Sequence, residues 1–255
     1  MGILTTKDLK LIIYMKFTIV TVTYNSENLL EKTIQSVINQ TCKDYEYIII
    51  DGKSTDKTVE IIKRYDSVLT HWVSEKDNGI YDAMNKAIGI ATGDWIIFLN
   101  SGDYFVNNEV LDILSMNADS SKYDIIYSDI LVEKKGEVIQ KVAAEPCNKQ
   151  RMYFCHQAAV TKTAIMKEMP FDTRFKMSAD LFFFKQCYYK NYRFKHIPKP
   201  LVFYDKTGVS NTNRLAGLYD NVAVIKAIDK APQKQLFLLK LYFVIYWNRL
   251  RKSRH

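Results

Sequence analysis

The sequence predicts an α/β fold with a mostly parallel central sheet. Residues 95–99 are five consecutive apolar residues, a pattern typical of a strand covered on both faces. Two earlier strand patterns, at 17–23 and 45–50, end like this one in a polar turn. Helical patterns follow these turns, which predicts a βαβαβαβ order. The carboxyl ends of parallel strands meet at one edge of a sheet, where we expect a ligand to bind.

Apolar residues that recur at helical spacing predict the helices between these strands. The first helix carries four of them on one face: Leu30, Ile34, Val37 and Ile38. Asn28 and Glu31 have the spacing of a capping box, which marks the start of this helix. Val59 and Ile62 indicate a shorter second helix. A third amphipathic pattern runs over residues 80–91 and ends at Gly93, as helices often do.

The pattern changes after residue 105 to a mixture of antiparallel strands and helices. We expect a helix at 108–116 and a strand at 124–132. A turn at Lys135 and Gly136 then leads into a return strand at 138–139. A short strand at 201–203 follows later. Ser178 is a natural N-cap for one more helix, which places Asp180 in the first turn, where the helix dipole stabilises negative charge.

The composition indicates a globular protein in a reducing compartment. The chain has 255 residues, of which 47% are hydrophobic, with only nine glycines and five prolines. Its four cysteines lack the close pairing of a zinc site and no secretory signal precedes them, so we expect them reduced and the protein cytoplasmic. The net charge of +8 comes from dispersed lysines without a nucleic-acid-binding motif, and we expect no nucleic-acid partner.

The polar turns that follow three of the strands carry the candidate site residues. Parallel strands would bring Asn25, Asp51 and Asp103 to one edge of the sheet. The Ser101-Gly102 turn lets backbone amides approach an anion, and the Asp103 carboxylate is a hard oxygen ligand that Mg²⁺ or Mn²⁺ prefers. The pattern therefore suggests a metal-bridged diphosphate. Asp56, by contrast, is predicted to cap the following helix.

Five segments together resemble the family 2 glycosyltransferases with the GT-A fold, in particular bacterial enzymes of O-antigen, capsule or colanic-acid-type polysaccharide synthesis. The segments are residues 22–25, 51–56, 77–86, 100–103 and 179–180, in the order of that family. The resemblance covers about residues 16–210. It implies an inverting enzyme that moves a sugar from a nucleotide-diphosphate sugar, with a UDP-sugar favoured, to a hydroxyl of a lipid-linked or polysaccharide acceptor.

The resemblance also implies a role for each matching residue. The residues implied to bind the nucleotide sugar are Thr23, Tyr24, Asn25, Asp51, Lys53, Asp77, Asn100, Ser101, Gly102 and Asp103. Asp103 would also bind Mn²⁺ or Mg²⁺, and Asp180 would be the general base. It further implies a division into an N-terminal extension (1–14), a nucleotide-sugar-binding half (15–105), an acceptor half (106–212) and C-terminal helices (213–255).

The chain departs from the family pattern at three places. Asn100 and Gly102 stand where the metal motif has acidic residues, and Gly52 replaces the second Asp of the nucleotide motif. Met84 occupies the position of a diphosphate-binding Arg, so Lys53, Lys86 or Lys206 would have to supply that charge.

Several alternatives remain open from the sequence. His156 is either a partly buried polar residue or a contact to the acceptor. The apolar segment 236–247 is followed by four basic residues, which suits a helix on the inner membrane surface as well as one packed on the body or on a second subunit. A sugar nucleotidyltransferase or a catalytically degenerate scaffold would be the competing classes of protein, although the nucleotidyltransferase would require a Gly-rich loop near residue 23.

Overall fold

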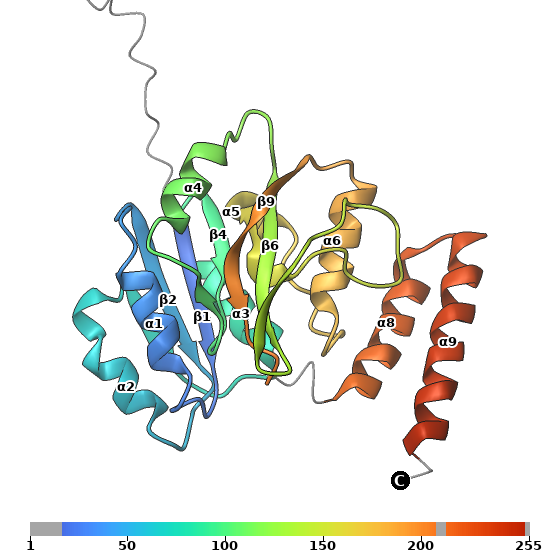
Figure 1. Ribbon diagram of the computed structural model, residues 1–255, viewed down its shortest axis with the longest axis horizontal. Coiled ribbons are helices and arrows are strands. Elements are labelled where there is room, and N and C mark those ends of the chain that lie inside the picture. Colours follow the sequence, from blue (N-terminus) through green and yellow to red (C-terminus); the bar gives the residue numbers. More distant parts are fainter. Residues whose placement is uncertain (1–16, 208–212, 253–255) are drawn as a thin grey trace, which may run out of the picture.

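The structure is a computed structural model that describes residues 17–207 and 213–252 (Figure 1). The proposed N-terminal extension (1–14) and residues 208–212 lie outside the described residues.

The first half of the described chain has the predicted βαβαβαβ order. Its elements are β1 (Phe17–Thr23), α1 (Leu30–Ile38), β2 (Tyr45–Asp51), α2 (Thr58–Arg64), the short helix η1 (Asp66–Val68), β3 (His71–Ser74), α3 (Ile80–Ile90) and β4 (Trp95–Phe98). The four strands are parallel and lie in the order β3-β2-β1-β4. Because the chain places β2 on one side of β1 and β4 on the other, the strand order reverses at β1.

The second half extends the same sheet with mostly antiparallel pairs. Its elements are β5 (Tyr104–Phe105), α4 (Val110–Asn117), β6 (Ile125–Lys134), β7 (Glu137–Lys141), η2 (His156–Ala158), β8 (Ala159–Lys162), α5 (Thr163–Glu168), α6 (Ala179–Tyr189), β9 (Phe194–Tyr204), α8 (Arg214–Ile228) and α9 (Gln233–Lys252). The described residues form a nine-stranded sheet, which continues from β4 through β8 and β6 to β9 and β5. The predicted hairpin joins β6 to β7, with both turn residues at positive φ.

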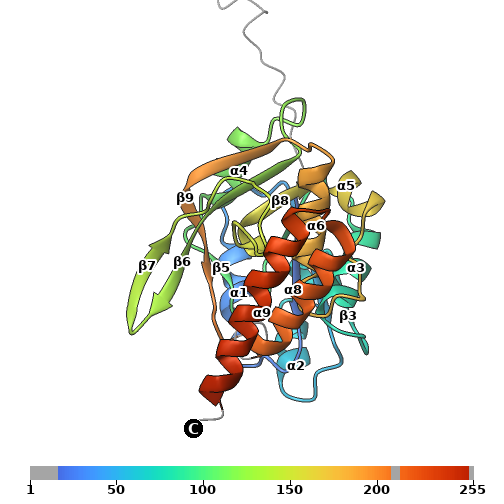
Figure 2. The ribbon, with the colours of Figure 1, turned by 90° about the vertical axis from the view of Figure 1, so that its right-hand side faces the viewer.

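Helices cover both faces of this sheet (Figures 1 and 2). One hydrophobic cluster joins the sheet to α3, α5 and α6, and a second joins it to α1, α2 and α4. A third, smaller cluster lies between α8 and α9, which form a helical hairpin beside α6. The α/β fold with a central sheet, predicted from the apolar runs, is therefore confirmed.

Strand β9 is longer than the sequence indicated, because only residues 201–203 have a clear strand pattern. Pro198 and Pro200 interrupt the pattern in the middle of the strand. The pairing with β6 absorbs them through register shifts, since Ser128 faces Ile197 and the next residue, Asp129, faces Pro200. A proline cannot donate a hydrogen bond to a sheet, so such an irregularity is where it is tolerated.

Two predicted helix caps are wrong in detail. Helix α1 begins at Leu30, and its start shows no side-chain cap; the carbonyl of Ser26 accepts the amides of Leu29 and Leu30 instead. The contacts of the preceding turn explain this, because Asp56 and Thr58 accept its backbone amides. Ser178 occupies the N-cap position of α6, but its hydroxyl donates to Asn221 on α8 rather than capping the helix.

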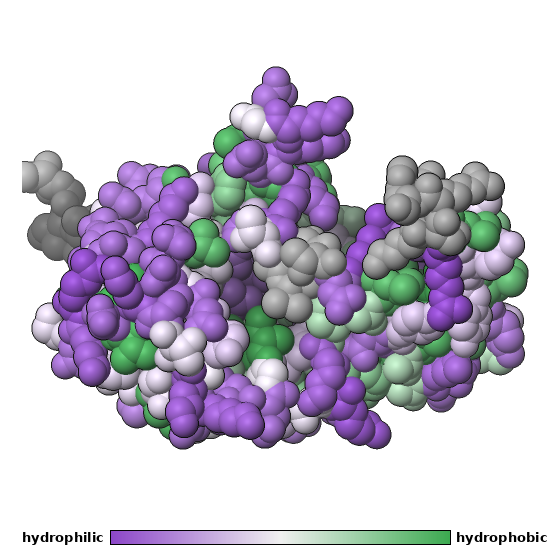
Figure 3. All heavy atoms as spheres, turned by 90° about the horizontal axis from the view of Figure 1, so that it is seen from below, coloured by the Kyte–Doolittle hydropathy of each residue, from purple (hydrophilic) through white to green (hydrophobic). Residues whose placement is uncertain are grey.

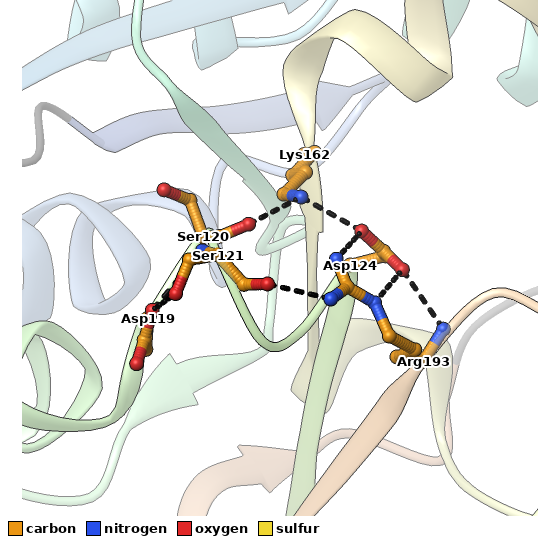
Figure 4. A network of polar contacts seen from close by, with 6 residues as sticks. All are labelled: Asp119, Ser120, Ser121, Asp124, Lys162 and Arg193. Carbon is orange, nitrogen blue, oxygen red and sulfur yellow. Dashed lines mark hydrogen bonds and ion pairs between the residues drawn. The ribbon is translucent and has the colours of Figure 1, made fainter.

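A charged cluster joins three strands at the edge where β6 and β9 begin (Figure 4). Asp124 accepts hydrogen bonds from Arg193 at 2.9 Å and from Lys162 at 2.7 Å. These partners hold the pKa of Asp124 below its usual range, Arg193 most strongly. Asp124 precedes β6, Lys162 ends β8 and Arg193 precedes β9, so the cluster ties the second half of the sheet together.

Candidate active site at the carboxyl ends of the strands

The candidate site residues gather where β1 and β4 end, at the point where the strand order reverses. Strand β1 runs downward in Figure 1, so Figure 3 looks onto the carboxyl edge of the parallel strands, and the surface there is hollowed near its centre. Such a reversal point leaves a crevice in which open α/β sheets bind their ligands.

Asn25 locks the turn after β1 to the turn after β2. Its side-chain oxygen accepts the amide of Thr55 at 2.8 Å, and its own amide donates to the Ser54 hydroxyl at 2.8 Å. Asn25 has φ 46°, a left-handed conformation that Asn tolerates better than most residues. The two turns therefore form one rigid unit.

Asp51 is completely buried beneath this unit. Its carboxylate accepts the amide and the hydroxyl of Ser54, at 3.0 and 2.5 Å, and the hydroxyl of Ser74 at 2.6 Å. Asp51 thus ties the turn after β2 to the end of β3. Asp56 was predicted to cap α2; the N-cap position is Lys57, but Asp56 accepts the amide of Thr58, the first residue of the helix, and the amide of Glu27.

Gly52 lies between an exposed aromatic ring and a carboxylate. Tyr24 is 62% exposed, and a Cβ atom built on Gly52 would lie 3.4 Å from its ring and 3.1 Å from Asp77 Oδ2. The carboxylate of Asp77 therefore comes close to the position at which the family motif has an Asp. Lys86 fixes Asp77 from the other side, at 2.5 Å from Oδ1. The ring, the glycine and the carboxylate form an open shelf that suits a planar base.

Of the three lysines predicted to replace the charge of the family Arg, two already contact other groups of the protein. Met84, on α3, is itself buried in the hydrophobic core. Lys86 is paired with Asp77 and with Glu75, and the Lys206 ammonium donates to the carbonyl of Glu133. Lys53 is exposed and has φ 65° in the turn after β2.

Asp103 lies beside a second carboxylate that the sequence did not single out. Asp103 is 3% exposed, and its Oδ1 accepts the amide of Asp205 at 2.8 Å. Gly102 has φ 98°, and a Cβ atom there would lie only 2.6 Å from Asp205 Oδ2. The carboxylate of Asp205 thus fills the space beside the glycine that replaces an acidic residue. Burial, and then the charge of Asp205, raise the pKa of Asp103 well above its usual value.

The oxygens around Asp103 fit a divalent cation. The side-chain oxygens of Asn100 and Ser101, in the same turn, are buried and have no hydrogen-bond partner among the described residues. Thr23 Oγ1, at the end of β1, is likewise buried and unpartnered. Hard oxygen donors of this kind suit Mg²⁺ or Mn²⁺. The described residues hold no group of three or more His, Cys, Asp and Glu side chains that could bind a metal, so diphosphate oxygens or water would complete the coordination.

Asp180 is held by two residues from other elements. The hydroxyl of Tyr81, on α3, donates to Oδ1 at 2.8 Å, and His156 Nδ1 lies 3.2 Å from Oδ2. Burial opposes ionisation of Asp180, but the hydrogen bonds from His156 and Tyr81 outweigh it, so the pKa of Asp180 lies below its usual value. His156 and Asp180 are 14% and 13% exposed at their side chains. His156 thus directly contacts Asp180, the predicted general base.

Cys155 shows that Asp180 and Asp103 lie around the same region. Burial raises the pKa of its thiol, and the charges of Asp103 and Asp180 raise it further. Both carboxylates therefore lie near Cys155, the residue that precedes η2.

Sequence reasoning missed Asp205 and Tyr81. Asp205 has the same signal as Asp103, a carboxylate soon after a predicted strand, but its contact with Asp103 joins segments 102 residues apart. Tyr81 lies 99 residues from Asp180, and no local pattern could pair them.

Comparison with known proteins identifies the family. The chain matches the description "Glycosyl transferase family 2" over residues 18–195, and it belongs to that family. Among curated proteins it is similar to a PGL/p-HBAD biosynthesis glycosyltransferase of Mycobacterium bovis, with 24% identity over 90% of this chain and 89% of the relative. It also resembles a poly(ribitol-phosphate) beta-glucosyltransferase of Bacillus spizizenii, with 38% identity over 38% of this chain and 16% of the relative.

Solved structures show the same fold. Residues 1–349 of S. aureus TarS in complex with UDP superpose with a TM-score of 0.67 and 22% identity, over 89% of this chain and 71% of that chain. A mannosyltransferase of Pyrobaculum calidifontis in complex with GDP-Man and Mn²⁺ gives a TM-score of 0.66 and 18% identity, over 90% and 69%. The GT-A fold expected from the resemblance is confirmed, and the protein is a glycosyltransferase rather than a scaffold or a nucleotidyltransferase.

Proposed function

We propose that this glycosyltransferase moves a hexosyl or N-acetylhexosaminyl group from a UDP-sugar to a hydroxyl of a lipid-linked or polysaccharide acceptor, with inversion and with help from Mn²⁺ or Mg²⁺. The observation that carries the proposal is the arrangement around β1. An open shelf for a base, formed by Tyr24, Gly52 and Asp77, lies at the same strand ends as the oxygen cluster around Asp103.

Each part of the donor has a place in this arrangement. The base would stack on Tyr24 and donate a hydrogen bond to Asp77. Lys53 would approach the diphosphate from the turn after β2. Asp103 and Asp205 would hold the cation, which neutralises the charge that develops on the departing diphosphate.

The acceptor side depends on Asp180. A hydroxyl is a poor nucleophile at neutral pH and needs a positioned group to accept its proton as it attacks the anomeric carbon. Asp180 is a buried carboxylate held ionised by two donors, and it reaches the site from the second half of the chain. Attack from the face opposite the leaving diphosphate inverts the anomeric centre.

The relatives support the donor and the pathway. Structures of TarS hold UDP and UDP-GlcNAc, whereas the Pyrobaculum enzyme holds GDP-Man with Mn²⁺. The curated relatives act in PGL/p-HBAD biosynthesis and on poly(ribitol-phosphate). These names favour a role in the synthesis of a cell-surface glycan.

A panel of donors tests the proposal directly. Thermal unfolding would be followed with UDP-glucose, UDP-galactose, UDP-N-acetylglucosamine and GDP-mannose, each with Mn²⁺ and with a chelator. A ligand at about 100 times its dissociation constant adds about 2.7 kcal/mol to stability. We expect a UDP-sugar to give the greatest shift, and the chelator to reduce it. A greater shift with GDP-mannose would contradict the UDP assignment, and no shift with any donor would contradict the function.

The C-terminal hairpin suggests where the acceptor lies. No helix in the described part of the chain is long and apolar enough to cross a membrane. Helix α9 nevertheless exposes large apolar side chains at helical spacing: Leu236, Leu239, Phe243, Tyr246 and Leu250. At the right of Figure 3, where α8 and α9 lie, hydrophobic residues reach the surface among hydrophilic ones.

We infer that this stripe docks the enzyme peripherally on an anionic membrane surface. Arg249, Arg251, Lys252 and Arg254 follow the aromatic end of the stripe in the sequence. Aromatic and basic residues on one helix are typical of interfacial binding, and a lipid-linked acceptor is confined to that surface. The competing occupant of the stripe is a second copy of the chain.

A further inference from the structure

Strand β7 forms the open outer edge of a hairpin. Among the described residues it pairs only with β6, so its other side has no partner strand there. All five of its residues, Glu137–Lys141, are exposed. In Figure 2 the β6–β7 hairpin projects from the body of the protein, with β7 on its outer side. An open strand edge presents unpaired backbone N–H and C=O groups, which can pair with another strand.

Strand β7 lacks two features that protect edge strands from such pairing, proline and β-bulges. Residues 137–141 contain no proline, and their pairing with β6 runs without a register shift. Val138 and Ile139 are 59% and 36% exposed, and β-branched residues of this kind favour strands. The outer side of β7 is therefore a regular edge that a partner strand can extend.

The strand is also held in position by the protein itself. Ile139 faces Val132 of β6, which is buried in the hydrophobic cluster that includes α1 and α4. The side-chain amide of Gln140 donates to Asp129 Oδ2 at 2.7 Å. A segment that is already ordered loses little conformational entropy when it binds, which favours association.

The hairpin turn determines which backbone groups of β7 point outward. Because the turn has two residues, the pair that closes the hairpin, Lys134 and Glu137, is a hydrogen-bonded one. Hydrogen-bonded and non-hydrogen-bonded pairs alternate along an antiparallel ladder. The backbone groups of Glu137 and of every second residue after it therefore point to β6, whereas those of Val138 and Gln140 point to the open side.

The charges of β7 are complementary to those of a second, antiparallel copy. Glu137 and Lys141 lie two residues before and two residues after Ile139, on the same face of the strand. When Ile139 lies opposite its counterpart, Glu137 of each copy faces Lys141 of the other. Val138 then faces Gln140 of the other copy, so the outward backbone groups of the two strands meet. Within the described part of the chain, neither the Glu137 nor the Lys141 side chain has a hydrogen bond or an ion pair.

We propose that two copies of this chain associate through β7, with the two strands antiparallel and a two-fold axis at Ile139. Such a contact is closed and uses the same residues in both copies. Two pairs of Glu137 with Lys141 flank its centre, and opposite charges directly across an antiparallel pair stabilise it. Five residues a side are far fewer than the roughly 20–30 of a standard interface, so we expect a weak, reversible dimer.

Exchange of the two charges tests this pairing. Glu137→Lys and Lys141→Glu each place two pairs of like charges across the contact, whereas the double variant Glu137→Lys/Lys141→Glu restores two pairs of opposite charge. Sedimentation velocity over a range of concentrations measures the dissociation constant of the dimer. We expect each single variant to raise this constant by at least about tenfold, and the double variant to return it to within about threefold of the wild type.

Glu109→Lys is the matched control, because it makes the same charge change on an exposed residue before α4, away from the hairpin (Figure 1). Its dissociation constant should equal that of the wild type. A wild type that remains monomeric at about 1 mM would overturn the proposal. A dimer that persists unchanged in both single variants would overturn it as well, because the contact would then lie elsewhere, such as on α9.

A disulfide tests the alignment of the two strands. In the proposed register Ile139 faces its own counterpart, with the two Cβ atoms about 4.5–5.5 Å apart, so a small adjustment allows a disulfide. Val138 lies one position away from the axis, and its two copies are diagonal neighbours about 7–8 Å apart, too far for a disulfide.

We therefore expect Ile139→Cys to form a covalent dimer on mild oxidation, and Val138→Cys to stay at the background of the wild type, whose four cysteines are free. Equal cross-linking of both variants, or of neither, would overturn the proposal. Neither experiment uses a donor sugar, so a failure of the proposed function would leave the β7 contact standing.

Discussion

Lys53 holds a backbone conformation that favours glycine. It has φ 65°, and a side chain in the left-handed region costs roughly 1–2 kcal/mol. Unfavourable backbone conformations of this kind gather at functional sites. Lys53 follows directly on Gly52 and is exposed, so its ammonium group is available to the diphosphate in the donor site that we propose.

Lys53→Gly should therefore stabilise the fold and weaken donor binding. We expect the free energy of unfolding to rise by about 0.5–1 kcal/mol, because glycine adopts this φ without strain. The dissociation constant of UDP should rise by about tenfold, since a charged contact is lost. Lys135→Gly is the matched control: Lys135 has φ 57° in the β6–β7 turn, so it should stabilise similarly and leave UDP binding unchanged. Equal UDP affinity in both variants would remove Lys53 from the site.

Asp103→Asn should separate nucleotide binding from cation binding. In the wild type we expect Mn²⁺ to tighten UDP binding at least tenfold, because the cation would bridge Asp103 and the diphosphate. The amide keeps the shape of Asp103 but loses its charge, so Mn²⁺ should have little effect on the variant. Isothermal titration with and without Mn²⁺ measures this difference. The control is Asp119→Asn in an exposed turn. An unchanged Mn²⁺ effect in Asp103→Asn would refute the metal assignment.

At the scale of elements, Glu46 holds three segments together in the interior. It lies on β2 and is 3% exposed. Its carboxylate accepts the Thr18 hydroxyl of β1 at 2.5 Å, and the backbone amides of Thr92 and Gly93 before β4 at 2.5 and 3.0 Å. Burial alone would raise the pKa of Glu46, but these hydrogen bonds lower it to about 2.

Glu46→Gln should destabilise the protein in a pH-dependent way. The folded pKa lies below the unfolded value, so the ionised carboxylate stabilises the fold above about pH 4.5, and this contribution is lost as the pH falls toward 2. We expect the variant to be less stable by about 2 kcal/mol at pH 7, and the difference to shrink steadily below pH 4.5. Urea unfolding of both proteins across this range provides the measurement. A difference that does not vary with pH would show that shape matters here rather than charge.

The C-terminal hairpin is tied to the body by a buried ion pair. Lys185 on α6 lies 3.0 Å from Asp229, which follows α8, and the two side chains are 2% and 0% exposed. Burial lowers the pKa of Lys185 although Asp229 opposes the shift. One oxygen of Asp229 has no hydrogen-bond partner among the described residues. The pair therefore links α6 to the hairpin although one carboxylate oxygen of Asp229 lacks a hydrogen bond.

Lys185→Met should be more damaging than replacement of the whole pair. The single change leaves a buried charge unpaired, which costs about 3–5 kcal/mol. In the double variant Lys185→Met/Asp229→Leu no charge remains buried, and we expect most of the lost stability to return. Chemical unfolding of the wild type, both single variants and the double variant gives the coupling. Additive losses would show that the two residues act independently.

The sequence predicted those elements whose signal is local. The apolar run of β4 and the apolar-rich segments of β1 and β2 identified the parallel strands, whose ends carry Asn25 and Asp103 at one edge of the sheet. It could not predict β9 as a whole, because Pro198 and Pro200 break its pattern and only the pairing with β6 accommodates them. The Asp205 carboxylate beside Gly102 and the Tyr81 bond to Asp180 arise from contacts between distant segments, which no spacing encodes.

At the scale of the whole molecule, α9 is apolar on two sides. Phe237, Leu241 and Ile245 are buried in the cluster shared with α8. Leu239 and Phe243, by contrast, are 69% and 67% exposed. A helix of a soluble fold normally turns a polar face to water, so an exposed apolar stripe marks an interaction surface. Deletion of α9 would uncover its inner cluster, and point substitutions on the stripe are therefore the sharper test.

Leu239→Asp/Phe243→Asp should release the protein from anionic membranes. Two apolar side chains that insert contribute about 1.5–3 kcal/mol each at full burial, and the added carboxylates are repelled by the lipid. We expect binding to phosphatidylglycerol vesicles to fall by more than about 10²-fold, and wild-type binding to weaken with salt, because basic residues near the surface add about 1 kcal/mol each. Met116→Asp is the control, since Met116 is 81% exposed on α4, outside the stripe. Vesicle sedimentation measures membrane binding, and analytical ultracentrifugation measures the oligomeric state. If the wild type does not bind vesicles and the double substitution converts a dimer into a monomer, the stripe is a contact between two copies of the chain.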